Sequence, residues 1–399
     1  MNILISFKQK GILRTINEFK WSLRKVKFFW LLLHINWVFS KWVFQKPKKK
    51  DILIYDAKMS EVIFLLLKKE SCEILHVRYE SINLHVIFKT LFNTGLKNFK
   101  NNYKLNFLNL VSPKIVITCI DNNMAFYKLK DLYDNAKYIC IQLSNRSMKF
   151  SNECANYYKN NTERLKADYI FIIGESYKKI FAKVIDSKIF CLGSIKNNYY
   201  YIKNKKVNEG KKSILFISQV YPASSYQRIR KEAKIFKSLN DYCIKKNYEL
   251  NLCSKNKASH INFYQKNFTK KNWNYFPRRN QGSSYEIVNE SDVIVFTNST
   301  LGLEALAKKK RCISFPPDGF PIRDFIKQYP ENGPFWFNDF NNNKMEEYIE
   351  KVVSYKDAEW AEIVNKNVDD IMMYDEKNTK FFEIINDLID KNLTTNKPI

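Results

Sequence analysis

The sequence predicts an α/β protein with two Rossmann-like domains, an N-terminal amphipathic helical segment and C-terminal helices. The chain has 399 residues, of which 45% are hydrophobic, which is ample for two cores and large for one. From Asp51 onward, short β-rich runs alternate with helical segments, a rhythm typical of parallel sheets covered on both faces. This alternation stops at a charged, polar stretch, residues 199–212, and then starts again. Two separate sheets are therefore expected.

Each predicted sheet has six candidate strands. Those of the first half are residues 52–55, 73–77, 115–120, 138–142, 169–173 and 189–192. Those of the second half are residues 213–217, 249–253, 273–276, 293–296, 312–315 and 335–337, and helical patterns follow from Met345 to Leu393. We therefore divide the chain into an N-terminal segment (1–50), a first Rossmann-like domain (51–205), a second Rossmann-like domain (206–370), and a C-terminal helix and tail (371–399).

The N-terminal segment contains an aromatic, apolar stretch, residues 28–44, flanked on both sides by basic residues. His34, Asn36 and Lys41 interrupt it, so it is too broken to span a bilayer. No small-residue cleavage site follows, which argues against a signal peptide. Two interpretations remain: a helix lying in the headgroup region of an anionic membrane, or a helix packed against the body of the protein. The first predicts a cytoplasmic protein held peripherally at the inner face of a bacterial membrane.

The formal net charge of +27 comes from lysines spread along the whole chain among many asparagines. Such a charge favours anionic partners, or it reflects only a solvated, lysine-rich surface. Specific nucleic-acid recognition is not expected, because zinc-finger spacing, an aromatic RNP-type strand and a basic heptad helix are all missing from the sequence. The eight cysteines form no CxxC pair, which fits a reducing compartment and predicts neither a disulfide framework nor a zinc site.

Open α/β sheets bind their ligands at the carboxyl ends of the strands, so the residues that follow each strand are the candidates for function. Carboxylates gather after the strands of the first half, where the candidates for acceptor binding are Asp56, Asn122, Asn123, Asn145 and Arg146. Donors and cations dominate the second half, where the candidates for nucleotide binding begin with Ser218, Gln219, Arg278 and Arg279. An anionic nucleotide is therefore expected on the second domain.

The most informative stretch is residues 291–315, which predicts a strand, a polar turn, a helix from Leu301 and a further strand. The first N–H groups of such a helix point out of the sheet edge and can hold a phosphate. Asn298, Ser299 and Thr300 would add side-chain donors, although one of them can equally be a simple N-cap. Glu304, one turn into the helix, is free to bind sugar hydroxyls or only complements the helix dipole.

Two further features favour phosphate on the second domain. Arg278 and Arg279 follow an aromatic run and can form bidentate bonds to phosphate, unless they are merely solvated. Residues 283–286 match a capping box, which predicts a short helix there with Ser284 and Tyr285 in its first turn.

A general base is expected among the carboxylates. A Walker loop, GxGxxG, GxSxG and HExxH are absent, and the four histidines are isolated from one another. Asp121 is the first candidate because residues 115–120 deliver it to the sheet edge, and Glu175 follows another predicted strand. Asp121 with its two following asparagines can equally form a hydrogen-bonded turn.

The stretch SDVIVFTNSTLGLEALAKKKRCISF resembles the donor-side motif of GT-B glycosyltransferases, especially bacterial surface carbohydrate (O-antigen or capsule) biosynthesis proteins. Further pieces match in order: VITCIDNNMAFYKL, YICIQLSNRS, DYIFIIG, ILFISQ and SSYEIVNESD. The resemblance runs from about Asp51 to the last helix. It implies two Rossmann-like domains facing a central crevice, a nucleotide-activated sugar bound mainly by the second, and no obligatory metal or other cofactor. By position it assigns Ser299, Thr300 and Glu304 to the donor.

The expected function is thus transfer of a sugar from a nucleotide-activated donor to a surface polysaccharide or lipid-linked glycan. One rival is another enzyme on the same scaffold, a nucleotide-sugar epimerase or a polyol-phosphate transferase. The other is a non-catalytic scaffold in polysaccharide assembly, suggested because residues 56–59 and 141–146 lack the glycines common in better characterised relatives.

Overall fold

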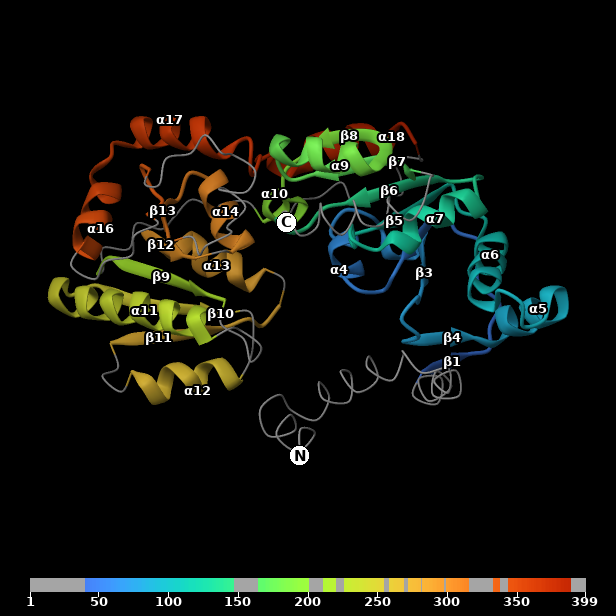
Figure 1. Cartoon of the computed structure of the whole chain (residues 1–399), viewed down its shortest axis with the longest axis horizontal. Coiled ribbons are helices and arrows are strands. Elements are labelled where there is room, and N and C mark those ends of the chain that lie inside the picture. The colour runs from blue at the N-terminus through green and yellow to red at the C-terminus, as the bar shows by residue number, and fades with distance from the viewer. Residues whose placement is uncertain are drawn as a thin grey trace.

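The computed structural model describes residues 40–146, 164–200, 211–219, 226–254, 258–268, 272–280, 282–297, 299–315, 333–337 and 344–388. Two larger parallel sheets lie at opposite ends of the molecule, each with its own helices (Figure 1). The predicted pair of Rossmann-like domains is therefore present. The N-terminal segment lies outside the described residues up to residue 39.

The first sheet contains all six predicted strands, in the order β3-β2-β5-β6-β7-β8 and all parallel. The strands are β2 (Ile52–Tyr55), β3 (Cys72–Leu75), β5 (Ile115–Thr118), β6 (Lys137–Ile141), β7 (Leu165–Ile172) and β8 (Ile185–Cys191). The helices between them are α4 (Ser60–Ile63), η1 (Lys69–Ser71), α5 (Leu84–Thr94), α6 (Phe99–Val111), α7 (Met124–Leu132), η2 (Glu175–Tyr177), α9 (Lys178–Val184) and α10 (Ile195–Tyr199).

The centre of this sheet is buried on both faces, which explains why β2 and β5 are continuous apolar runs. Alternate residues of β2 point to opposite sides: Leu53 and Tyr55 join one hydrophobic cluster, whereas Ile52 and Ile54 join another. All four are at most 1% exposed.

The second sheet has the order β11-β10-β9-β12-β13, again parallel throughout. Its strands are β9 (Ser213–Ser218), β10 (Glu249–Ser254), β11 (Trp273–Pro277), β12 (Val293–Phe296) and β13 (Arg311–Ser314). Its helices are α11 (Tyr226–Lys246), α12 (Ala258–Asn267), α13 (Ser283–Glu290), α14 (Thr300–Ala307), α16 (Met345–Ser354) and α17 (Asp357–Val368). The sixth strand predicted at residues 335–337 is wrong: these residues form one isolated bridge, Ser314 to Trp336, because the chain turns tightly where Gly333 N–H donates to the Trp336 carbonyl.

After α17 the chain returns to the first domain. The N–H of Ser176 donates to the Asp370 carbonyl, and the N–H of Met373 donates to the Ile173 carbonyl, each at 2.7 Å. Gly193 has φ +76°, and a Cβ there would lie 2.1 Å from the Met373 oxygen, so this crossing requires glycine. The chain then forms η4 (Glu376–Asn378) and α18 (Thr379–Asn386), whose Phe381 packs in the core of the first domain.

One small sheet was not predicted. The strand β1 (Lys41–Val43) pairs in parallel with β4 (Ser81–Asn83), which runs directly into α5. The Asn83 side chain caps α5 by accepting from the Val86 N–H at 3.2 Å, and it donates to the Gln45 carbonyl at 2.8 Å. Figure 1 shows β1, β4 and α5 at the outer part of the first domain.

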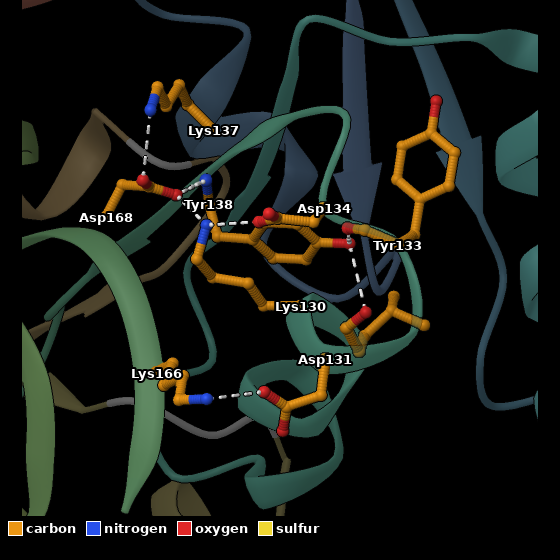
Figure 2. A network of polar contacts seen from close by, with 9 residues as sticks. Lys130, Asp131, Tyr133, Asp134, Lys137, Tyr138, Lys166 and Asp168 are labelled. Atoms are coloured by element: carbon orange, nitrogen blue, oxygen red, sulfur yellow. Dashed lines mark hydrogen bonds and ion pairs between the residues drawn. The ribbon is translucent and has the colours of Figure 1, made fainter.

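The amino ends of β6 and β7 are held by a charged cluster (Figure 2). Asp168 accepts from Lys130 Nζ at 2.8 Å, from the Tyr138 N–H at 2.8 Å and from Lys137 Nζ at 3.4 Å. Burial alone would raise the pKa of Asp168, but Lys130 and the Tyr138 N–H together lower it. Because this cluster lies at the edge opposite the carboxyl ends of the strands, we interpret it as structural.

Candidate functional site

The candidate site is built from the two places where strand order reverses, because ligands of open α/β sheets bind outside the carboxyl ends of the strands there. In the first domain that place lies between β2 and β5, and in the second between β9 and β12. Asp56 and Asp121 follow the first pair of strands, and Ser218 and Thr297 follow the second.

Both carboxylates of the first edge are buried and ion-paired. Asp56, with a left-handed φ of 80°, accepts from Arg78 Nε at 2.7 and 3.0 Å and from the Lys58 N–H at 3.0 Å. Asp121 is fully buried and accepts from two nitrogens of Arg146, with Nε at 2.7 Å. Protonation of Asp121 would break this ion pair. Asp121 can therefore act as a general base only if Arg146 moves away. Its catalytic role stays a prediction.

Gln142, which is fully buried just after β6, stabilises the turn that carries Asn145 and Arg146. Its side-chain nitrogen donates to the Ser144 carbonyl at 3.0 Å, and its side-chain oxygen accepts from the Ile173 N–H at 3.2 Å. A glutamine that satisfies two neighbouring strand ends fixes where the turn leaves the sheet.

The remaining predicted residues of the first edge differ in placement. Asn123 caps α7, with its side-chain oxygen 3.2 Å from the Ala125 nitrogen, while Asn122 is exposed beside Asp121. Glu175 lies in η2, where its exposed carboxylate is 3.8 Å from Lys178 Nζ and the returning C-terminal segment passes next to it. The hydrogen-bonded-turn alternative therefore holds for Asn123, and Glu175 faces a different environment from Asp121.

The second edge is organised by a buried carboxylate that the sequence analysis missed. Glu232 of α11 is 1% exposed. It accepts from Ser218 Oγ at 2.9 Å, from the Gln219 N–H at 3.0 Å and from Thr297 Oγ1 at 3.1 Å. Tyr264 Oη in turn donates to Ser218 Oγ at 2.8 Å. Glu232 thus connects the ends of β9 and β12 across the point where the strand order reverses.

A sequence signal for Glu232 does exist. Ile235, Phe236 and Leu239 follow it at intervals of three, four and seven residues and are all fully buried. A glutamate at the head of the apolar stripe of an amphipathic helix predicts a buried carboxylate.

Helix α14 brings the donor-side candidates together. Its N-cap is Ser299, which is 5% exposed and makes no side-chain capping hydrogen bond; Asn298 lies outside the described residues. Gly302 packs on the ring of Phe296 so closely that a Cβ would lie 2.3 Å from it, which lets the helix start directly above β12. The first turn of α14 therefore directs its N–H groups towards the strand end, a geometry suited to an anion.

Glu304 is 2% exposed and has a donor on each carboxylate oxygen. Ser194 Oγ of the first domain donates to Oε1 at 2.5 Å, and Tyr285 Oη of the second donates to Oε2 at 2.8 Å. The main-chain oxygen of Glu304 accepts from Asn197 Nδ2 at 2.8 Å. A sugar or ribose hydroxyl that binds Glu304 would compete with these two hydroxyl donors for the carboxylate.

The surroundings of Glu304 are aromatic and hold one lysine. Tyr285 stacks on Tyr200 with ring centroids 5.0 Å apart, and Lys308 Nζ lies 5.5 Å from the Tyr285 centroid. Burial, and then the charge of Glu304, raise the pKa of Tyr285, so it remains a hydrogen-bond donor. Burial lowers the pKa of Lys308 to about 8, although Glu304 acts in the opposite direction.

The helix predicted after the arginine pair is present as α13, but the capping box is wrong. The N-cap is Gly282, and the Asn280 side chain accepts from the N–H groups of Gly282 and Ser283 instead. Glu286 pairs with Arg279 at 3.5 Å, and both are largely exposed. Arg278 is close enough to Tyr285 to affect its pKa, and Ser284 bonds to the Cys253 thiol. Of the two arginines, Arg278 therefore lies near the Glu304 cluster.

The two edges meet at α14. Thr300 Oγ1 in its first turn lies 3.3 Å from Asn145 Oδ1 of the first domain, and Glu304 one turn later bonds to Ser194. The structure therefore unites Thr300, Asn145, Arg146 and Asp121 through consecutive contacts. Within the described ranges, no helix is long and apolar enough to cross a membrane. Among those same residues no cluster of three or more His, Cys, Asp or Glu can hold a metal, and the expectation of a metal-independent site stays a prediction.

Comparisons with known proteins bear on this geometry. Residues 139–389, more than half of the chain, match the model of a family described as O-antigen biosynthesis proteins. Among curated proteins none matches the sequence. The UDP-GlcNAc 2-epimerase of Methanocaldococcus jannaschii in complex with UDP-GlcNAc and UDP is similar with a TM-score of 0.52 and 14% identity, covering 85% of this chain and 99% of that chain. MnaA of S. aureus with UDP is similar with a TM-score of 0.52 and 12% identity, covering 86% and 98%. These similarities confirm the predicted GT-B arrangement of two Rossmann-like domains.

Proposed function

The chain belongs to a family of O-antigen biosynthesis proteins, and on that premise we propose that it transfers a sugar from a nucleotide-activated donor to a surface polysaccharide or lipid-linked glycan. The main support for this proposal is the position of α14 between the two domains. Its first turn, whose N-cap Ser299 makes no side-chain capping hydrogen bond, lies at the strand end of the second domain, while Thr300 contacts the Asn145 turn of the first. A ligand at this point touches both domains at once.

The donor would bind mainly to the second domain. Its phosphates would lie against the N–H groups at Ser299, Thr300 and Leu301, where the positive end of the helix dipole favours anions. A hydroxyl of the ribose or of the sugar would bond to Glu304 in place of Ser194 or Tyr285. Arg278, near Tyr285, would add a cation. The fold of the UDP-containing structures supports this arrangement.

The acceptor would lie against the first domain. Its hydroxyl would lose a proton to Asp121 as Arg146 swings towards the phosphates, and its oxygen would bond to the anomeric carbon. The bond from that carbon to the phosphate oxygen would break, and α14 with Arg146 would stabilise the charge left on the nucleotide. Exchange of Arg146 from a carboxylate to a phosphate keeps the guanidinium paired throughout.

Calorimetric titration of the purified protein with UDP-, GDP- and CMP-sugars tests the proposal. We expect one class to bind, and Glu304→Ala to weaken that binding by about tenfold or more because a charge-assisted hydrogen bond is lost. Glu347→Ala, at an exposed position of α16, is the matched control. Binding of no nucleotide sugar, or equal binding by both variants, would contradict the proposal.

A second candidate, epimerisation of a nucleotide sugar, is supported by the near-complete coverage of the epimerase chain. Product analysis separates the two functions, because an epimerase converts the donor with no acceptor present. Nucleotide binding without turnover on any acceptor would instead favour a non-catalytic scaffold in polysaccharide assembly. Transfer of a polyol phosphate from its nucleotide would indicate a polyol-phosphate transferase.

A further inference from the structure

Helix α5 presents an apolar face to solvent. Phe92 is 92% exposed, Leu96 just beyond the helix 70%, Phe88 67% and Leu91 40%. The spacing of three and four residues from Phe88 puts Leu91 and Phe92 on the same side of the helix, and Leu96 follows just after its end. The opposite side, with Val86 and Thr90, is buried. Single exposed apolar residues need no explanation, but a contiguous aromatic face marks an interaction surface.

The neighbouring strand β1 extends this face. Trp42 is 37% exposed and Phe44 75% exposed, and β1 contacts both β4 and α5. The pairing of β1 with β4 and the bond from Asn83 to the Gln45 carbonyl fix this corner to the first domain. We call the six side chains the β1–α5 face: Trp42, Phe44, Phe88, Leu91, Phe92 and Leu96.

The charge around the β1–α5 face has one sign. Residues 40–50 and 81–120 contain ten lysines and no aspartate or glutamate, although the chain as a whole has 40 acidic residues. The exposed lysines among these ten are Lys41, Lys46, Lys48, Lys49, Lys97, Lys100 and Lys114. The adjoining acids are already engaged, since Asp51 pairs with Lys114 at 3.1 Å and Glu80 lies 3.8 Å from His76.

We propose that the β1–α5 face is the surface by which this protein lies on an anionic lipid bilayer. Its aromatic and leucine side chains would enter the headgroup region, and the surrounding lysines would lie on lipid phosphates. Other occupants match the charge poorly. A twofold contact between copies would bring two lysine-rich surfaces against each other, and residues 1–39 carry seven lysines and arginines against one glutamate.

This inference deepens the proposed function by assigning the surface that would bring the protein to a lipid-linked acceptor, but its test needs no turnover. The full chain is sedimented with vesicles of phosphatidylcholine and phosphatidylglycerol, and with vesicles of phosphatidylcholine alone. The test variant is Phe88→Ser with Phe92→Ser. The matched control is Ile244→Ser, which changes a 48%-exposed isoleucine of α11 in the second domain.

We expect the full chain to bind the anionic vesicles and the Ile244→Ser control to bind them equally well. The double variant should bind them more weakly, by about tenfold or more. Equal binding by the double variant and the parent would overturn the proposal, as would equal binding to both kinds of vesicle. A double variant that keeps its lipid binding but changes its oligomeric state or unfolding midpoint would assign the face to a second copy or to the chain itself. Nucleotide titration of the same samples reports separately on the proposed reaction.

Discussion

The two sheet edges that meet at α14 hold their buried carboxylates in different ways. In the first domain, Asp56 and Asp121 are each paired with an arginine of the same domain. In the second domain, Glu304 is held by hydroxyl groups, one from each domain, and Glu232 by hydroxyls and an N–H group of its own domain.

The first edge is therefore held by contacts within one domain, whereas Glu304 is held by contacts between the two domains. The arginine pairs of the first edge persist wherever the second domain lies. The Glu304 contacts depend on both domains, so any ligand that replaces Ser194 at Glu304 also changes how the domains are joined. Ligand binding at Glu304 would therefore be coupled to the domain arrangement.

The largest effect should come from breaking the buried pair of the first edge. Arg146→Ala leaves the fully buried Asp121 without its cation, and we expect the free energy of unfolding to fall by about 3–5 kcal/mol. Urea unfolding measures this. Arg78→Ala is the comparison: the Arg78 side chain is 45% exposed and Asp56 keeps the Lys58 N–H, so a smaller loss is expected. Equal losses would show that the two pairs are equivalent.

The next effect concerns pH and the lysine beside Glu304. The pKa of Lys308 is about 8 in the folded protein, against 10.5 ordinarily. Between these values the unfolded chain binds the extra proton, so stability should rise with pH across this window, by at most about 3 kcal/mol. Unfolding curves at several pH values, with Lys308→Met as the control, isolate this contribution. If both proteins show the same pH dependence from about 8 to 10.5, Lys308 carries its charge in the folded protein throughout.

Glu304→Gln should have a moderate effect that joins stability to binding. One of the two hydroxyl donors loses its carboxylate acceptor, so we expect a loss of about 1–2 kcal/mol in unfolding free energy and weaker nucleotide binding. Ser194→Ala removes only the contact from the first domain. If the contrast between the edges holds, Ser194→Ala costs stability but leaves a lone pair of Glu304 open, and nucleotide binding is kept or improved. Loss of binding in Ser194→Ala would break the contrast.

The smallest effect is expected for Thr300→Val, which removes the contact with Asn145. Both side chains are partly exposed and 3.3 Å apart, so water can replace the interaction at a cost of about 0.5–1 kcal/mol. Small-angle scattering should show whether the domains separate. An unchanged radius of gyration together with unchanged stability would show that the Thr300 contact does not hold the domains together.

Most of the fold follows from local pattern. The central strands β2, β5 and β12 are buried on two faces, so each is an apolar run between polar segments. The pairing of β1 with β4 could not be predicted in this way. Residues 81–83 are too short for a pattern, and their partner lies 40 residues earlier, so tertiary contact decides the pairing.

The sequence predicts where the candidate site residues lie along the sheet edges, but it does not predict which side chains they contact. Strand ends placed Asp56, Asp121 and Ser218 at the correct edges. Their partners are set by which side chains the turns bring together, and this has no periodic signature. Ser194 and Glu304, for example, are 110 residues apart. The capping box failed for a related reason: Asn280 competes for the same N–H groups, and a four-residue motif does not show that competitor.

The return of the C-terminal segment has a consequence for biosynthesis. Phe381 and Ile385 complete a core of the first domain that also contains Phe171 and Leu192, and Met373 can cross Gly193 only because that residue has no Cβ. On the ribosome, this hydrophobic surface stays open until the entire second domain has been translated. The N-terminal domain therefore gains the last side chains of this core only after the second domain has been made. The nascent first domain must wait, partly solvated, for the helix that closes it.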